Sequence, residues 1–160
     1  DHHRRRSLSF LELKLPPVAI VLLCGVGMWF AAARLPGPTF AFAGQRPIAA
    51  ALFILGLAAG KRGVIVFRHH ATTVNPTMPE KASTVVTTDI FSWTRNPMYL
   101  GLAIILVGWT IFLGNLHAGL GVPVFVAWMS RFQIVPEERV LAKKFGAPYD
   151  DYCRRVRRWI

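Results

Sequence analysis

Several chemistries are excluded by what this sequence of 160 residues lacks. It has two cysteines, Cys24 and Cys153, no Cys-x-x-Cys pair, and five histidines without the spacing of metal ligands. It also has no phosphate-binding P-loop, no Rossmann glycine pattern after a strand, and no Ser–His–Asp set with a nucleophile elbow. We therefore expect no metal, no disulfide between the two cysteines, and neither hydrolysis nor redox metal chemistry.

Acidic residues are also scarce, with 8 Asp and Glu against 19 Lys and Arg, for a formal net charge of +11. At the same time 53% of the residues are hydrophobic, a combination that is rare in a small soluble domain. The apolar residues must therefore be segregated into membrane spans of about 20 residues each. We expect one all-α, integral-membrane domain over residues 1–160 with four transmembrane helices. These are predicted at residues 15–33, 48–67, 97–113 and 116–135.

The basic residues fall almost entirely on one side of such a four-span arrangement. The segment before the first span, the connection 68–96 with its flanks, and the tail 136–160 with its flank hold 17 of the 19 basic residues. The positive-inside rule then places both termini, the connection and the active site in the cytoplasm, on the inner (cytoplasmic) membrane. We expect a membrane and a lipid or lipidated acceptor as partners, and no nucleic acid.

The segment Arg95–Gly101 combines a cation, an amide, a proline and a tyrosine at the mouth of an apolar helix. Pro97 suits the first turn of that helix, because its missing N–H would have no partner there. Arg95 and Asn96 are then just outside the helix, and Tyr99 is one turn inside it. A donor-rich patch in this place is where a soluble charged molecule could meet a lipid-dissolved one.

Three further stretches have a structural and a functional interpretation. The threonine-rich connection around residues 71–94 is either a solvated linker or, because it carries Phe91 and Trp93, a folded cytoplasmic cap. The adjacent Glu137 and Glu138 either complement a helix dipole or need a cation beside them under the membrane. Gly-x-Gly within the first span (residues 25–27) is typical of close helix packing.

The tail after Pro148 has its apolar residues at helical spacing, with arginines between them. The apolar positions are Tyr149, Tyr152, Val156 and Trp159. This pattern predicts short C-terminal interfacial helices over 136–160 that rest on an anionic leaflet. The mixture of cations and carboxylates on this side suits a zwitterionic amino-acid headgroup, and the aromatics suit a flat base.

Two blocks together carry a more specific signal. Arg95–Gly101 is followed by a hairpin of two spans, then by Glu137-Glu138-x2-Leu141-x3-Phe145-Gly146-x2-Tyr149-x2-Tyr152 and Val156-x-Arg158. Over roughly residues 68–160 this resembles the isoprenylcysteine carboxyl methyltransferase family, which is related to the phospholipid N-methyltransferases, and it resembles a prokaryotic member. The resemblance implies methyl transfer from S-adenosylmethionine to a membrane-associated acceptor, most like isoprenylcysteine carboxyl O-methylation, with S-adenosylhomocysteine as the product.

The resemblance also implies a cofactor site, in which Glu137 would hold the methionyl ammonium. The predicted cofactor contacts are Ser83, Thr84, Val85, Val86, Phe91, Asn96, Pro97, Met98, Tyr99 and Glu137. Asn96 stands where the family usually has histidine, and Gln133 where the eukaryotic enzymes have a substrate-contacting arginine.

We predict Arg95, Tyr99 and Glu138 as catalytic residues, and Arg131 and Gln133 as substrate contacts. A carboxylate acceptor needs no base, whereas an amine must first lose a proton. Three alternatives stay open: a phospholipid or small-amine N-methyltransferase, a noncatalytic membrane scaffold with a broken cofactor site, and a reductase related to the sterol reductases, whose chains are much longer.

Overall fold

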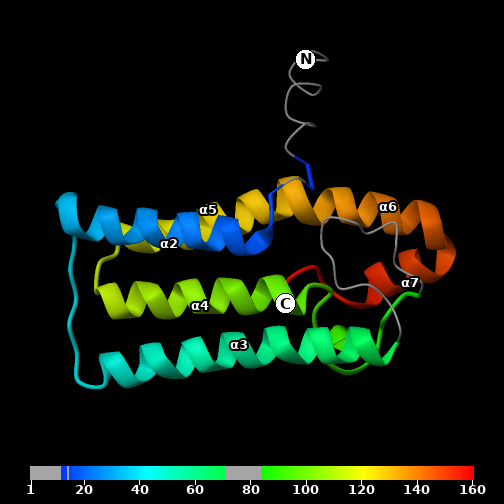
Figure 1. Ribbon diagram of the computed structural model, residues 1–160, viewed down its shortest axis with the longest axis horizontal. Coiled ribbons are helices and arrows are strands. Elements are labelled where there is room, and N and C mark those ends of the chain that lie inside the picture. The colour runs from blue at the N-terminus through cyan, green and yellow to red at the C-terminus, as the bar shows by residue number, and fades with distance from the viewer. Residues whose placement is uncertain (1–11, 14, 71–83) are drawn as a thin grey trace, which may run out of the picture.

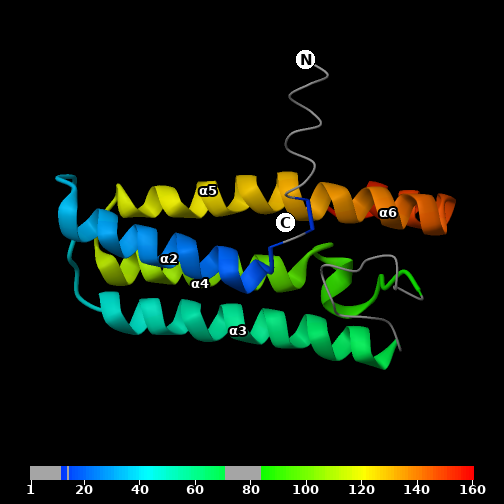
Figure 2. The ribbon, with the colours of Figure 1, turned by 45° about the horizontal axis from the view of Figure 1, so that its top comes forward.

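The computed structural model describes residues 12, 13, 15–70 and 84–160, and within them the chain is helical (Figure 1). The long helices lie side by side along one axis, α2 and α5 next to each other and α4 between them and α3 (Figures 1 and 2). Their bounds are α2 Pro17–Arg34, α3 Gln45–His69, α4 Pro97–Leu113, α5 Gly121–Trp128, α6 Val135–Phe145 and α7 Ala147–Arg155.

The all-α membrane architecture predicted from the sequence is confirmed. Within the described residues, three helical stretches are long and apolar enough to cross a bilayer, namely Pro17–Arg34, Gln45–His69 and Ala118–Phe145, and the shorter α4 is apolar as well. The chain is therefore an integral membrane protein. Which end of the bundle faces the cytoplasm stays a prediction from the charge pattern.

The fourth span differs from the prediction, because it does not end before Pro136. The short helix η4 (Ala118–Leu120), α5, the π-helical turn η5 (Met129–Ile134) and α6 form one helical stretch, Ala118–Phe145. Proline removes one backbone hydrogen bond, and a π turn is a usual way to absorb such an irregularity. The carbonyl of Phe132, four residues before Pro136, instead accepts a hydrogen bond from the Leu13 N–H (3.0 Å).

Helices α3 and α4 approach each other most closely at paired glycines. A Cβ at Gly56 would lie 2.4 Å from the Gly101 carbonyl oxygen, and a Cβ at Gly101 would lie 2.4 Å from the Gly56 carbonyl oxygen. In contrast, Gly25 and Gly27 have no atom within 4 Å of a built Cβ. The Gly-x-Gly of the first span is therefore not a close-packing site, and the prediction of one there was wrong.

The end of the bundle where α2 and α4 finish is closed by backbone pairing. Thr39 and Asn115 form an isolated antiparallel bridge, with hydrogen bonds from Phe40 N–H to Gly114 O (2.9 Å) and from Leu116 N–H to Pro38 O (3.0 Å). Gly114 ends α4 at φ 63°, a left-handed conformation that glycine adopts without strain. The segment between α2 and α3 is thus fixed to the turn that follows α4.

The opposite end carries the described part of the cap, where the 3-10 helix η3 (Asp89–Ser92) lies against α3. Phe91 stacks on Phe67 of α3 at 4.6 Å between ring centroids, and Arg62 forms an ion pair with Asp89. Residues 71–83 of the predicted cap, including Ser83, lie outside the described residues.

Helix α7 uses its apolar face differently from the prediction of an interfacial helix. Tyr149, Tyr152 and Val156 are buried in a cluster with Phe91 and Val66, and so pack on the cap and on α3. The face that we expected to rest on lipid therefore packs on protein. The sequence pattern is the same in both cases, because each requires one apolar stripe.

The α3–α4 contact generates a test of the packing. We expect Gly56→Ala to destabilise the protein by about 1–3 kcal/mol, because the new methyl group meets the Gly101 backbone, which cannot move aside as a side chain would. Thermal unfolding of the detergent-solubilised protein measures the change.

Gly60→Ala is the matched control on the same helix, because nothing lies within 4 Å of its Cβ. We expect Gly60→Ala to be neutral or to stabilise by up to about 1 kcal/mol, the helix propensity of alanine over glycine. Equal unfolding temperatures for the two variants would contradict the close approach.

Candidate active site

The start of α4 is held between α3 and the C-terminal tail. Pro97 begins the helix and is buried, and a Cβ at Gly63 of α3 would lie 3.0 Å from its ring. The tail crosses the same point in an extended conformation: Arg95 N–H donates to Arg157 O (3.0 Å), and the Asn96 side-chain amide donates to Arg158 O (2.8 Å). The predicted site segment is thus fixed by backbone groups more than 60 residues away in sequence.

One turn into α4, Tyr99 meets the predicted acid. The Tyr99 hydroxyl donates to Oε1 of Glu137, and the Gln133 amide donates to the same oxygen at 2.7 Å. Tyr99 and Gln133 are 5% and 3% exposed, so this cluster lies inside the protein. Among the described residues no donor reaches Oε2 of Glu137, which leaves one carboxylate oxygen for a further hydrogen-bond donor.

The neighbouring acid, Glu138, has charged partners instead. Arg158 reaches it with two nitrogens (2.9 and 2.7 Å), and Arg95 lies 3.2 Å from Oε1. The bidentate bond to Glu138 raises the pKa of Arg158, so the guanidinium stays charged. The Arg95 guanidinium also donates to Sγ of Cys153. The cation that the sequence required beside the acidic pair is therefore present, from two separate segments.

The predicted cofactor contacts of the cap contribute apolar surface. Val86 and Phe91 are buried, whereas Thr84 and Val85 are half-buried. The hydroxyl of Tyr152 donates to the carbonyl of Phe91 at 2.7 Å. Burial raises the pKa of Tyr152, so this hydroxyl remains a donor at neutral pH. Met98, half-buried, packs on the main core beside Tyr99.

The two predicted substrate residues both lie in the π turn η5, but their side chains have different partners. Gln133 points inward to Glu137, but the Arg131 side chain is 44% exposed and pairs with Glu12 at 2.7 Å. The structure therefore brings Gln133 to the Tyr99 cluster and places Arg131 with the segment that precedes α2.

Sequence reasoning did not assign Arg158 to the site. Its guanidinium holds Glu138, and its carbonyl accepts bonds from Asn96 (2.8 Å) and from the Thr94 hydroxyl (3.5 Å). The only signal in the sequence was its place in the terminal Val156-x-Arg158 of the resemblance, where four arginines of similar spacing made the choice among them arbitrary.

Chemically, this arrangement offers a carboxylate with an open oxygen, two hydrogen-bond donors and a rigid backbone at the end of a membrane helix. An ammonium or a hydroxyl group is the natural partner of Oε2 of Glu137. The open oxygen of Glu137 therefore suits a ligand that carries a cationic or hydroxyl donor.

Comparisons with known proteins agree with this chemistry. The phospholipid methyltransferase family model matches residues 45–148. An uncharacterized protein of Haemophilus influenzae is 49% identical over 63 residues, which are 39% of this chain and 100% of that protein. A protein-S-isoprenylcysteine O-methyltransferase of Saccharomyces cerevisiae is 30% identical over 106 residues, which are 66% of this chain. The match spans 44% of the yeast protein's length.

The Glu138 pairings generate a prediction about the tail. We expect Glu138→Gln to lower the local stability of residues 147–160 by about 2 kcal/mol, since hydrogen bonds to charged groups contribute roughly that much. Hydrogen–deuterium exchange in detergent micelles should show faster exchange in this segment and unchanged protection in α3.

Asp151→Asn is the control on the same tail, because the Asp151–Arg154 pair is exposed (59% and 70%). Such a pair contributes at most about 0.5 kcal/mol, so exchange should stay as in the wild type. If the two variants exchange alike, the Glu138 pairings do not hold the tail.

Proposed function

The chain belongs to the phospholipid methyltransferase family, whose members are membrane methyltransferases that use S-adenosylmethionine, and from this premise we propose that it methylates a lipid-borne acceptor where α4 begins. The observation that carries the proposal is the buried cluster of Tyr99, Gln133 and Glu137 at the end of an apolar bundle. A soluble cofactor can reach this end from the water, and a lipid acceptor can reach it sideways from the bilayer.

We assign the binding of the methionyl ammonium to Glu137. Its Oε1 accepts hydrogen bonds from Tyr99 and Gln133. These two bonds fix the plane of the carboxylate, and so they also fix the direction of Oε2. A preorganised carboxylate loses little conformational entropy on binding, which favours affinity. Asn96, just before α4, and Pro97, its first residue, would contact the cofactor from one side, and Thr84, Val85, Val86 and Phe91 from the cap.

S-adenosylmethionine supplies a sulfonium-activated methyl group, so an acceptor atom can gain the methyl while the electron pair of the broken C–S bond stays on sulfur. The protein then has to align the acceptor and exclude water. Tyr99, Phe91 and Tyr152 are buried near this end of the bundle, and we assign to them the exclusion of water from the acceptor. We assign to Tyr99, whose hydroxyl donates to Glu137, the positioning of that carboxylate beside the acceptor.

We assign Arg95 and Glu138, which the sequence suggested as catalytic, to positioning. Glu138 is paired with both Arg95 and Arg158, and so it is held as an anion that fixes the tail over the start of α4. Both oxygens of Glu138 are engaged by guanidinium groups, so neither is left to contact an acceptor.

This environment favours an acceptor that is already nucleophilic. A carboxylate has a pKa of about 4 and is ionised at neutral pH, whereas a protonated amine must first lose a proton. Since neither Glu137 nor Glu138 is placed as a base, carboxyl O-methylation of a prenylated cysteine, the activity in the name of the yeast relative, is the acceptor chemistry we propose. The second candidate is N-methylation of a phospholipid, as the name of the family indicates.

Calorimetric titration with S-adenosylhomocysteine tests the cofactor site. We expect micromolar binding by the wild type and a loss of at least about tenfold in Glu137→Gln, because one charge-assisted hydrogen bond of the ammonium becomes a neutral one. Asp151→Asn, an exposed acid of α7, should bind as the wild type.

The circular dichroism spectrum, through its helical signal, establishes that each variant is folded. No binding by the folded wild type would refute the proposed activity and favour the noncatalytic scaffold. Wild-type affinity in Glu137→Gln would refute the assignment of Glu137 and leave the activity intact.

Methyl transfer from labelled cofactor separates the two acceptors. With an S-prenylated N-acetylcysteine we expect a base-labile methyl ester, and the acceptor adds no pH dependence to the rate between about pH 6 and 9, since its carboxylate is ionised throughout. A base-stable label in phosphatidylethanolamine, formed at a rate that rises with pH, would instead establish amine methylation.

A further inference from the structure

A groove of about 670 Å³ runs along the outside of the bundle between α2 and α3. Its floor is a face of α4 that includes Trp109 and Phe112, and its walls come from α2 and α3, with Trp29 and Phe53 among them. The groove arises because α2 packs chiefly on α4, η4 and α5, whereas α3 packs chiefly on α4. The two outer helices therefore leave a face of α4 uncovered between them.

Glycine keeps this groove open. Gly25 lines it and has no atom within 4 Å of a built Cβ, so any larger side chain there would project into the groove. The Gly25 carbonyl accepts a hydrogen bond from the Trp109 indole at 3.0 Å, and Trp109 stacks on Phe112 with ring centroids 5.4 Å apart. The polar edge of the indole is thereby satisfied, and flat aromatic faces form the floor.

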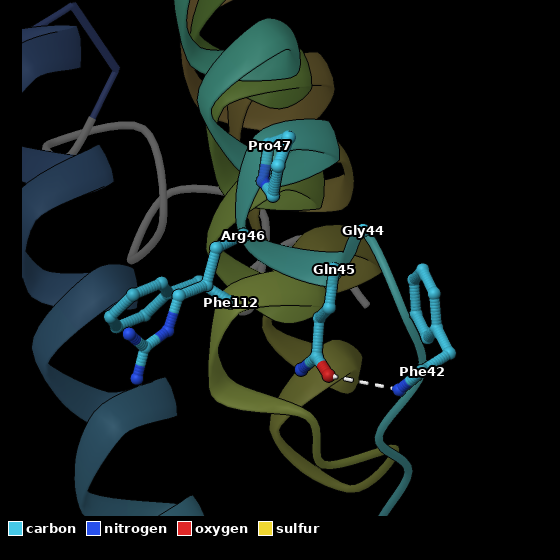
Figure 3. A pocket seen from close by; sticks show the side chains of 6 residues that line it. All are labelled: Phe42, Gly44, Gln45, Arg46, Pro47 and Phe112. Carbon is cyan, nitrogen blue, oxygen red and sulfur yellow. Dashed lines mark hydrogen bonds between the residues drawn. The ribbon is translucent and has the colours of Figure 1, made fainter.

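One cation stands at the end of the groove. Arg46, in the first turn of α3, lines both the groove and an adjoining pocket of about 430 Å³ that includes Gly44 and Gln45. Arg46 and Phe112 point to the same side, toward α2 (Figure 3). Among the described residues, no acid lines either cavity, and Arg46 has no ion pair or hydrogen bond.

The dimensions match one leaflet. From Phe112 to Ile105 the floor of the groove extends about 10 Å along α4, at 1.5 Å per residue, within the roughly 15 Å of hydrocarbon in half a bilayer. Tyr99 lies a further six residues along the helix, and so about 20 Å from Phe112. The charged end of the groove and the candidate active site are therefore at opposite ends of the bundle.

We propose that this groove is a binding site for an anionic phospholipid of the leaflet opposite the candidate active site, with an acyl chain along Trp109 and Phe112 and the phosphate on Arg46. A lone, exposed arginine at the edge of an apolar groove is suited to an anionic group, and none of the described residues provides one there. A lipid phosphate is such a group, at the depth where the apolar chain begins. This site is separate from the proposed methyl transfer and does not depend on it.

Native mass spectrometry of the full chain, released from detergent containing equal amounts of phosphatidylglycerol and phosphatidylcholine, tests the proposal. We expect the wild type to retain one lipid per chain with a preference for phosphatidylglycerol. In Arg46→Gln the preference for phosphatidylglycerol should be about fivefold weaker, which is the effect of one arginine on an anionic lipid. Gly25→Leu should retain neither lipid, because its side chain fills the groove.

Two matched controls belong to the same experiment. Gly27→Leu also projects into open space but does not line the groove, and Arg34→Gln removes a cation at the same end of the bundle that already lies over the Phe30 ring, 5.3 Å from its centroid. Both should retain lipid as the wild type does. Equal lipid retention in Gly25→Leu and Gly27→Leu would overturn the proposal.

The same measurements would reveal either of two other occupants of the groove, and either result would overturn the proposal. If a second copy of the chain fills the groove, Gly25→Leu changes the number of protomers in the particle. If the tail of the methyl acceptor fills it, an S-prenylated N-acetylcysteine displaces the retained lipid, and Arg46→Gln leaves the lipid preference unchanged.

Discussion

A single carboxylate, Glu138, connects three parts of the chain that are far apart in sequence. It extends from α6 and is held by Arg95, just before α4, and by Arg158, in the last three residues. Because an unpaired charge at this depth would be costly, all three segments must meet there. The backbone bonds of the tail to Arg95 and Asn96, and the burial of α7 on the cap, follow from that meeting.

The two adjacent acids have opposite surroundings because successive residues of a helix point about 100° apart. Glu138 turns toward the guanidinium groups, and Glu137 turns toward the hydroxyl of Tyr99 and the amide of Gln133. Glu138 is neutralised by arginines of the protein itself. Among the described residues, Glu137 receives only neutral donors, and so it retains the capacity to bind a cation. An adjacent pair of acids thus provides both a structural anchor and a binding group.

The sequence was sufficient to predict the apolar helices, the cation beside the acids and the meeting of Tyr99 with Glu137, because these depend on composition, helical period and a two-block motif. The sequence was not sufficient where a residue far away in the chain determines the local structure. The helix continues through Pro136, and the Phe132 carbonyl accepts a hydrogen bond from Leu13, a residue that nothing near Pro136 in the sequence indicates. Likewise, the apolar stripe of α7 could not reveal whether lipid or Phe91 covers it.

The glycines of the membrane helices show the same dependence on distant partners. Gly56 and Gly101 let two backbones approach, as small residues do where no hydrophobic force brings helices together. Gly25, in an equally apolar helix, faces open space and gives its carbonyl to Trp109. Close packing therefore joins α3 to α4, whereas a hydrogen bond joins α2 to the same helix at a greater separation. The bilayer must fill whatever space the helices leave. This difference in packing leaves such a space between α2 and α3, and we infer that lipid occupies it.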